Sequence, residues 1–222
     1  MYIAIISDLI GSRELADRNK AQQALHSTLE QCNEIFKDKL AARFTITVGD
    51  EFQGLLKPEA NPFHILDWIE FHLETLNFRS GIGIGEITTD IIEDRALGAD
   101  GSAFWNAREA ISSVHDHNDY GAVRTRVEGI STDVDSLVND LLAATDMIKS
   151  GWTTLQRETF RELLDLGIYD ARFEQKSIAE SLEISDVALY KRLRSSQMKL
   201  YLRSRGTLHR TLIQYIQGED GL

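Results

Sequence analysis

The stretch ITVGDEFQGLL, residues 46–56, decides how the first half of the chain is expected to fold. Its apolar flanks predict two strands, and Gly49 followed by Asp50 and Glu51 predicts the tip of a hairpin between them. A Gly-Asp pair at such a tip is ordinary turn chemistry. The same carboxylates would also suit a metal ion facing a phosphate, so the rest of the sequence must decide between these two interpretations.

Working outward from the hairpin, the hydrophobic pattern predicts an α+β fold. Strands are expected at 2–7, 42–48, 52–56, 78–88 and 121–127, and helices at 13–39, from 61 onward and at 101–115. The first six elements follow the order β-α-β-β-α-β, which is typical of a ferredoxin-like antiparallel sheet with helices on one face. Trp68, Trp105 and Cys32 lie on predicted helices and are expected in the core.

After residue 130 the pattern predicts helices alone. They are expected at 133–148, 153–166, 176–183, 185–196 and 199–217. We therefore predict two domains, 1–130 and 131–222, although the helix at 133–148 could pack on either.

Charge divides the chain in the same way. The net charge is −11, with residues 1–150 carrying 13 basic and 25 acidic side chains and residues 151–222 carrying 11 and 10. Residues 187–218 hold seven basic side chains and no acid. The halves are expected to have different functions. One cysteine and no long apolar run predict a cytoplasmic protein without a disulfide or a membrane span.

Acidic residues also follow the first predicted strand. In a ferredoxin-like sheet, Asp8 at the end of that strand would lie near Asp50 at the hairpin tip. Two close carboxylates favour a cation between them, and Mg²⁺ prefers such oxygen ligands together with phosphates. Gly11, Ser12 and Arg13 open the next predicted helix and could bind phosphate. Alternatively, Asp8 is simply a cap or turn residue.

Four segments resemble the palm domain of class III nucleotidyl cyclases and their GGDEF relatives. They are DLIGS (8–12), VGDEF (48–52), RSGIGIGEITT (79–89) and GSAFWNAREA (101–110). With the helical tail, the whole chain resembles the SatD family. The resemblance implies that Asp8 and Asp50 bind Mg²⁺, with Glu51 as a further candidate and Leu9 at a position whose carbonyl can join them. It also implies that residues 11–13 bind the phosphates of a nucleotide, and that the palm forms a homodimer.

The sequence departs from active cyclases at the helix that serves the transition state. The cyclase asparagine and arginine fall on Trp105 and Glu109, and a one-residue shift restores Asn106 but places Ala110 at the arginine position. Asn106 and Arg108 remain the catalytic candidates, and Arg108 or Arg79 could act from a partner chain. Because a missing cation at a phosphoryl centre costs orders of magnitude in rate, ligand binding is favoured over cyclisation.

The segment 176–196 resembles the helix-turn-helix of sigma-factor region four. Ile178, Ala179 and Leu182 would face inward, and Ser185 would cap the second helix. DNA contacts are expected at Ser185, Asp186, Tyr190, Lys191, Arg192 and Arg194, and Lys199, Arg203, Arg205 and Arg210 could extend the basic surface.

Three functions remain open. The first is a DNA-binding regulator whose cyclase-like domain binds a nucleotide or mediates dimerisation. The second is a Mg²⁺-dependent nucleotidyl cyclase or transferase, with the helices as a docking domain. The third is a scaffold without catalysis.

Overall fold

The computed structural model describes residues 1–14, 17–73, 76–116, 121 and 123–218. The strands are β1 (Tyr2–Leu9), β2 (Leu40–Ile46), β3 (Glu51–Leu56), β4 (Phe78–Gly85) and β5 (Thr125–Glu128). The helices are α1 (Arg18–Ile35), α2 (Pro62–His72), α3 (Ser102–Asp116), α4 (Thr132–Ser150), α5 (Thr154–Asp165), α6 (Gln175–Ser181), α7 (Asp186–Ser195) and α8 (Met198–Gln217), with short 3-10 helices at Ser12–Glu14 and Lys37–Lys39. These elements are consistent with the predicted α+β class.

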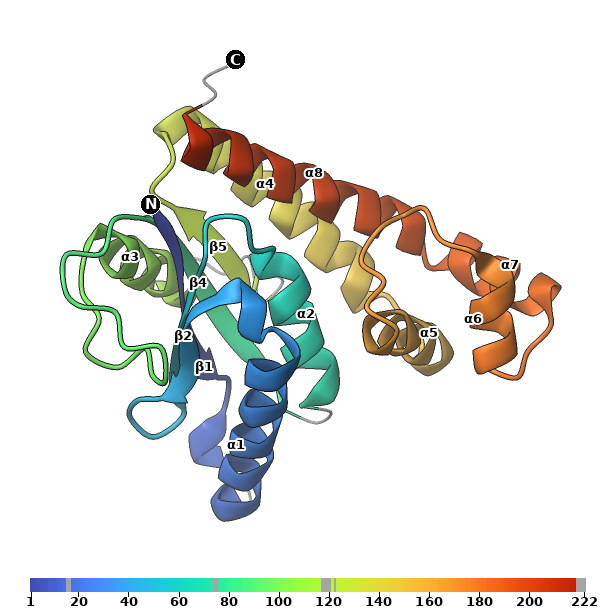
Figure 1. Cartoon of the computed structure of the whole chain (residues 1–222). Helices are drawn as coiled ribbons and strands as arrows, with labels where there is room; N and C mark the ends of the chain where they lie inside the picture. Colours follow the sequence, from blue (N-terminus) through green and yellow to red (C-terminus); the bar gives the residue numbers. More distant parts are fainter. Residues whose placement is uncertain (15–16, 74–75, 117–120, 122, 219–222) are drawn as a thin grey trace.

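The strands form one sheet in the order β2-β3-β1-β4-β5, with β1 at its centre (Figure 1). β1 pairs antiparallel with β3 and β4, and β2 pairs antiparallel with β3, so the hairpin at 46–56 forms as predicted. β5, however, pairs parallel with β4. The four strands of the first six elements are therefore antiparallel as predicted, but the complete sheet is mixed, because the chain passes through α3 before adding this last strand.

Helices cover both faces of the sheet rather than one. Alternate residues of β1 point to opposite faces, so Ile3 and Ile5 join the core under α1 and α2, whereas Ala4 and Ile6 pack with Ala103 of α3. Figure 1 shows α1 and α2 in front of the sheet and α3 on the other side. This corrects the expectation of a one-sided arrangement.

The glycines of β4 explain why α3 can lie so close to the sheet. A Cβ added at Gly83 would lie 2.0 Å from the carbonyl oxygen of Ala103, and one at Gly81 would lie 2.1 Å from that of Ala107. No side chain fits between these backbones. Of the two tryptophans expected in the core, Trp68 is buried, but Trp105 lies on the outer side of α3 with 61% of its surface exposed. Cys32 is buried as predicted.

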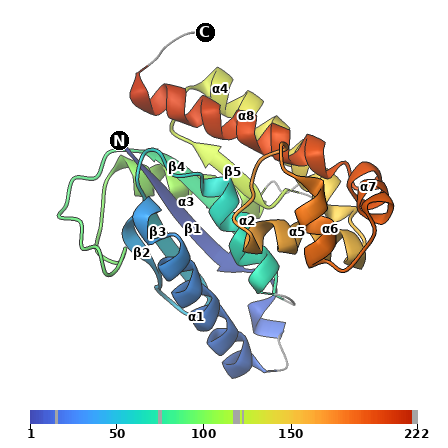
Figure 2. The same ribbon diagram turned by 45° about the vertical axis from the view of Figure 1, so that its right-hand side comes forward.

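The C-terminal helices pack against the sheet part through α2 and β5. α4 and α8 lie side by side, and α5, α6 and α7 form a group at one end (Figures 1 and 2). Apolar residues on both sides of residue 130, among them Ile69, Leu142 and Tyr201, belong to one core. The division into domains at this residue stays a prediction.

Local capping accounts for several helix starts. Asn61 accepts hydrogen bonds from the backbone N–H groups of Phe63 and His64, and Pro62 occupies the first helical turn. Asp17 caps α1, which begins at Arg18, five residues later than the predicted start at 13. Thr153 and Gln156 form a capping box at α5. Short polar side chains thus set where these helices begin.

Candidate functional site

Three charged residues meet where β1 ends and β3 and β4 begin. Asp8 of β1 is paired in register with Glu51 of β3 on one side and with Arg79 of β4 on the other. Residues at matching register positions share a face, and this is the face that α3 covers. The Asp8 carboxylate accepts two hydrogen bonds from Arg79, one from Nε at 2.7 Å and one from Nη2 at 2.9 Å.

A second arginine reaches the same place from α3. Arg108 donates from both terminal nitrogens to the Glu51 carboxylate, and Thr47 donates its hydroxyl at 3.0 Å. The hydrogen bond from Arg108 lowers the pKa of Glu51 below its ordinary value, and the same pair raises the pKa of Arg108. The Glu51 carboxylate is therefore ionised at neutral pH, and both carboxylates are bound bidentately by an arginine.

The four side chains line an open hollow of about 270 Å³, completed by Ile111, Ser112, His115 and Asp116 of α3. Two acids and two guanidiniums balance formally, and half of the Arg108 side chain is exposed. We call Asp8, Glu51, Arg79 and Arg108 the open cluster. Its charges are paired but remain accessible to solvent.

The oxygen donors of the open cluster suit Mg²⁺ chemically, but every one of them already accepts from an arginine. Within the described ranges, no group of three or more His, Cys, Asp or Glu side chains is placed to hold a metal ion. A divalent cation would therefore compete with Arg79 and Arg108. The residues fit a cation and an anion bound together, since the displaced guanidiniums could then donate to the anion.

The remaining predicted ligands lie around this hollow. The hairpin tip does lie against the end of β1, because the Leu9 N–H donates to the Asp50 carbonyl at 3.3 Å. The residue paired with Asp8 across the sheet is nevertheless Glu51. Gly11 has a left-handed backbone (φ +69°) and leads into the 3-10 helix that contains Ser12 and Arg13. That helix has three residues, and α1 begins only at Arg18, so residues 11–13 do not open a long helix.

The two catalytic candidates differ in their contacts. The Asn106 side chain donates to the Ile84 carbonyl at 2.7 Å and lies against Gly129, so it ties α3 to β4. Arg108 instead faces the acids of its own chain. Arg79, considered earlier as a residue from a partner chain, also pairs within its own chain. The contact of Arg108 could not be read from the sequence, because it depends on the position of α3.

The predicted DNA-contacting residues lie on α7 and the residue before it. Ser185 caps α7, while Asp186, Tyr190, Lys191 and Arg194 are exposed. Arg192 is half-buried and donates to the Thr159 hydroxyl of α5 at 3.3 Å. Arg205, which was expected to extend the basic surface, is 2% exposed and pairs with Asp146. That expectation was wrong, because Arg205 lies on the inner face of α8.

Sequence reasoning missed a buried charged cluster centred on Asp67 of α2. Lys149 donates to Asp67 at 2.8 Å, and the hydroxyls of Tyr169 and Tyr201 donate to its other oxygen at 2.5 and 2.6 Å. We call these four residues, with Glu70, the Asp67 cluster. A hint was available, since an aspartate stands in the middle of the apolar segment HILDWIEF.

The fold and these contacts define an α+β protein with a five-stranded mixed sheet, an open acid–arginine cluster and a helical C-terminal part. No described helix is long and apolar enough to cross a membrane. Residues 2–213 match the SatD family, and the chain belongs to that family.

Comparison with known structures gives a distant likeness only. The chain is similar to a bacterial light-regulated adenylyl cyclase with a TM-score of 0.38 and 14% identity, over 57% of this chain and 42% of that one. The aligned part thus spans less than half of the cyclase, and a likeness at this level says nothing about activity. A search of curated proteins found no match.

Proposed function

We propose that this SatD-family protein is a regulator that binds DNA through α7. The observation that carries the proposal is the two-sided character of this helix. Leu189 and Leu193 are buried, whereas the opposite side presents Tyr190, Lys191 and Arg194 to solvent. A tyrosine with 56% of its surface exposed beside two cations suits contact with a charged groove.

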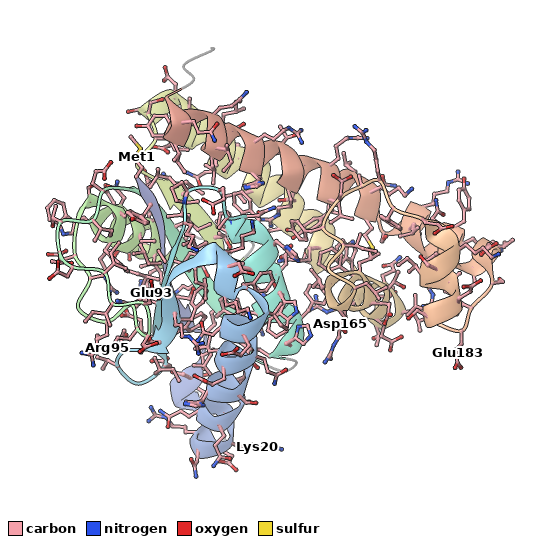
Figure 3. All side chains as sticks on the ribbon, in the orientation of Figure 1. Met1, Lys20, Glu93, Arg95, Asp165 and Glu183 are labelled. Atoms are coloured by element: carbon pink, nitrogen blue, oxygen red, sulfur yellow. The ribbon has the colours of Figure 1, made fainter. Side chains whose placement is uncertain are left out.

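The connection between α6 and α7 supports a helix-turn-helix interpretation. Glu183 adopts a left-handed backbone (φ +54°) at the position where such turns often use glycine. The Ile184 N–H donates to the Ala179 carbonyl at 2.9 Å, which closes α6 before Ser185 starts α7. Glu183 points away from the rest of the chain at the far end of the helical part (Figure 3).

The contacts divide into two kinds on this proposal. Ser185, Asp186, Tyr190 and Arg194 would reach base edges, and Lys191 would contact phosphate. Arg192 would contact phosphate only if it released Thr159. The acidic sheet part lies away from α7, which reduces its repulsion of DNA (Figure 1).

Binding of the full chain to a random-sequence DNA duplex, followed by selection of preferred sites, tests the proposal. Lys191→Gln should weaken binding to all sequences and reduce the salt slope by about 1, whereas Arg194→Gln should relax sequence preference. Arg95→Gln is the matched control, because Arg95 is an exposed cation on the opposite side of the molecule (Figure 3). Equal affinities for all three variants would contradict DNA binding and favour docking of these helices to a protein.

The open cluster supports a second candidate function, binding of a nucleotide or other phosphate ligand together with Mg²⁺. Asp8 and Glu51, with Asp50 nearby, would hold the cation, which when bound would neutralise phosphate charge. Arg79 and Arg108 would then donate to the phosphates, a task to which a planar guanidinium is suited. In this exchange each carboxylate replaces a guanidinium with Mg²⁺, and each guanidinium replaces a carboxylate with a phosphate.

This exchange predicts that the two ligands bind cooperatively. Calorimetric titration should show weak binding of Mg²⁺ alone and tighter binding when ATP or GTP is present, with both lost in Asp8→Asn. Mg²⁺ binding that is independent of nucleotide would contradict the exchange. Turnover of the bound nucleotide would identify the cyclase or transferase alternative, for which Arg108 is the charge-stabilising candidate.

The exposed indole of Trp105 supports dimerisation as a further role of the sheet part. Large aromatic side chains are enriched at protein interfaces, and Trp105 is held in place by a 2.8 Å hydrogen bond to Asp100. Light scattering of the full chain tests for a homodimer, and Trp105→Gln should shift the protein to monomer if α3 forms the contact.

A further inference from the structure

A second polar hollow lies at the junction between the sheet part and the C-terminal helices. It is lined by residues of α2, α4, α5 and α8 and by residues at the starts of β4 and β5, and its volume is about 340 Å³. None of the open-cluster residues lines it. Its size falls at the small end of the range for small-molecule sites. We call it the junction pocket.

Charge in the junction pocket favours an anion. Three acids line it, Asp67, Glu70 and Asp146, and so do four cations, Arg124, Lys149, Arg157 and Arg205. In a chain of net charge −11, this gives a local surplus of one positive charge. A single small anion would remove that surplus.

The inner part of the pocket is already committed to internal pairs. Arg205 pairs with Asp146, and both are at least nine-tenths buried. Lys149 donates to Asp67 and Glu70, which uses two of its three N–H groups. These contacts hold α2, α4 and α8 together, and the carboxylates have little capacity left for a cation.

The outer part of the pocket retains free donors. Arg157 lies over the Phe71 ring at 4.3 Å, and its nearest carboxylate oxygen, on Glu70, is 3.7 Å away, which is longer than a hydrogen bond. Arg124 uses one of its five N–H groups, on Asn77 at 2.9 Å. Within the described residues, no other hydrogen bond occupies these two guanidiniums.

We propose that the junction pocket binds a phosphate group, carried by a phosphate monoester or present as the free ion, through Arg124, Lys149 and Arg157. Three donor side chains, from the residue before β5, from α4 and from α5, match the three outer oxygens of a tetrahedral phosphate, whereas a planar carboxylate offers two. The ligand would contact the sheet part and the helical part at once, and would therefore stabilise their packing.

The experiment is a calorimetric titration of the full chain with inorganic phosphate and, separately, with glycerol 2-phosphate, both in chloride of matched ionic strength. Saturable binding is expected. Arg157→Gln and Arg124→Gln should each weaken it about tenfold or more, since each removes a charge-assisted hydrogen bond. Tighter binding of glycerol 2-phosphate would identify the ligand as an organic monoester, and tighter binding of phosphate would identify it as the free ion.

Two controls separate this site from the rest of the molecule. Arg203→Gln removes an exposed cation of α8 and should leave affinity unchanged. Arg108→Gln reports whether phosphate binds at the open cluster instead. Arg157→Lys should give intermediate affinity, because it keeps the charge but loses the planar fork. The proposal is overturned if phosphate does not bind saturably, if both pocket variants bind like the wild type, or if Arg108→Gln alone abolishes binding.

Discussion

The Asp67 cluster and the open cluster use the same chemistry in opposite surroundings. In each, carboxylates are bound by cationic side chains from distant parts of the chain. Asp67 has 3% of its side chain exposed, and three donor side chains surround it within the core. Arg108 of the open cluster is half exposed and faces a hollow.

The difference between the clusters separates a structural role from a functional one. Burial alone would raise the pKa of Asp67, yet the charges of Lys149 and Arg205 and the surrounding hydrogen bonds lower it, so the aspartate is ionised and fully partnered. Removing Lys149 leaves the buried Asp67 carboxylate without its ion-pair partner. In the open cluster, water or a ligand can replace a lost partner, so those pairs can exchange at little cost.

Asp67→Ala should give the largest effect, a loss of about 3–5 kcal/mol in the free energy of unfolding. Lys149 would keep only Glu70, and the hydroxyls of Tyr169 and Tyr201 would lose their acceptor. Urea unfolding measures the loss. Asp8→Asn is the matched change in the open cluster and should cost about 1 kcal/mol or less. Similar losses in both variants would remove the contrast between the clusters.

Gly83→Ala should cost about 3 kcal/mol, because the new methyl group would meet the backbone of α3 at 2.0 Å. The helix must move, and Arg108 moves with it, so the open cluster should be disturbed while the Asp67 cluster stays intact. Thermal unfolding measures the cost. Gly206→Ala on α8 is the control, since its nearest neighbour is 3.6 Å away, and it should stabilise the protein by up to about 1 kcal/mol. A neutral Gly83→Ala would mean that α3 does not contact β4 this closely.

The sequence predicts the parts of the fold that neighbouring residues determine, but not the parts that depend on contacts between distant segments. The hairpin at 46–56 and the helix starting at Pro62 were predicted because local turn and capping chemistry determines them. The parallel addition of β5 and the position of α3 were not, since they depend on packing between distant segments. Glycines in a strand, such as Gly81 and Gly83, permit another backbone to approach closely, but the sequence does not identify the approaching element.

The candidate site shows the same limit. Asp8 was singled out from its place after a strand, but its pairing with Glu51 and Arg79 follows from the sheet register. Arg205 was assigned to the surface because basic residues are usually exposed, and the structure buries it against Asp146. A buried charge cannot be recognised until its partner, 59 residues away, is known.

Acid should lower the stability of the fold around the Asp67 cluster through His64, which stacks on Tyr169 of that cluster. Burial lowers the pKa of His64 to about 4, with the charge of Asp67 opposing and His209 adding to the effect. Because the unfolded chain binds this proton at about pH 6.5, stability is lost as pH falls from 6.5 toward 4.

The expected loss from His64 between pH 7 and pH 5 is about 2 kcal/mol, measured by urea unfolding at both values. His209, whose pKa is also lowered by burial, adds a loss of the same sign. His64→Gln should flatten the pH dependence, whereas His26→Gln, at an exposed position of α1, should leave it unchanged. An unaltered slope in His64→Gln would show that the imidazole is not buried in the neutral form.

Arg108→Gln should give the smallest effect on stability, less than about 1 kcal/mol, because the pair with Glu51 is exposed to solvent. A double-mutant cycle with Glu51→Gln isolates the pair, and its coupling energy should be equally small. The same substitution should abolish the cooperativity between Mg²⁺ and nucleotide, since a guanidinium is then missing from the exchange. A coupling energy above about 3 kcal/mol would place the open cluster with the Asp67 cluster as a structural element. A small coupling energy with unchanged ligand binding would instead leave Arg79 as the cation that receives the phosphate.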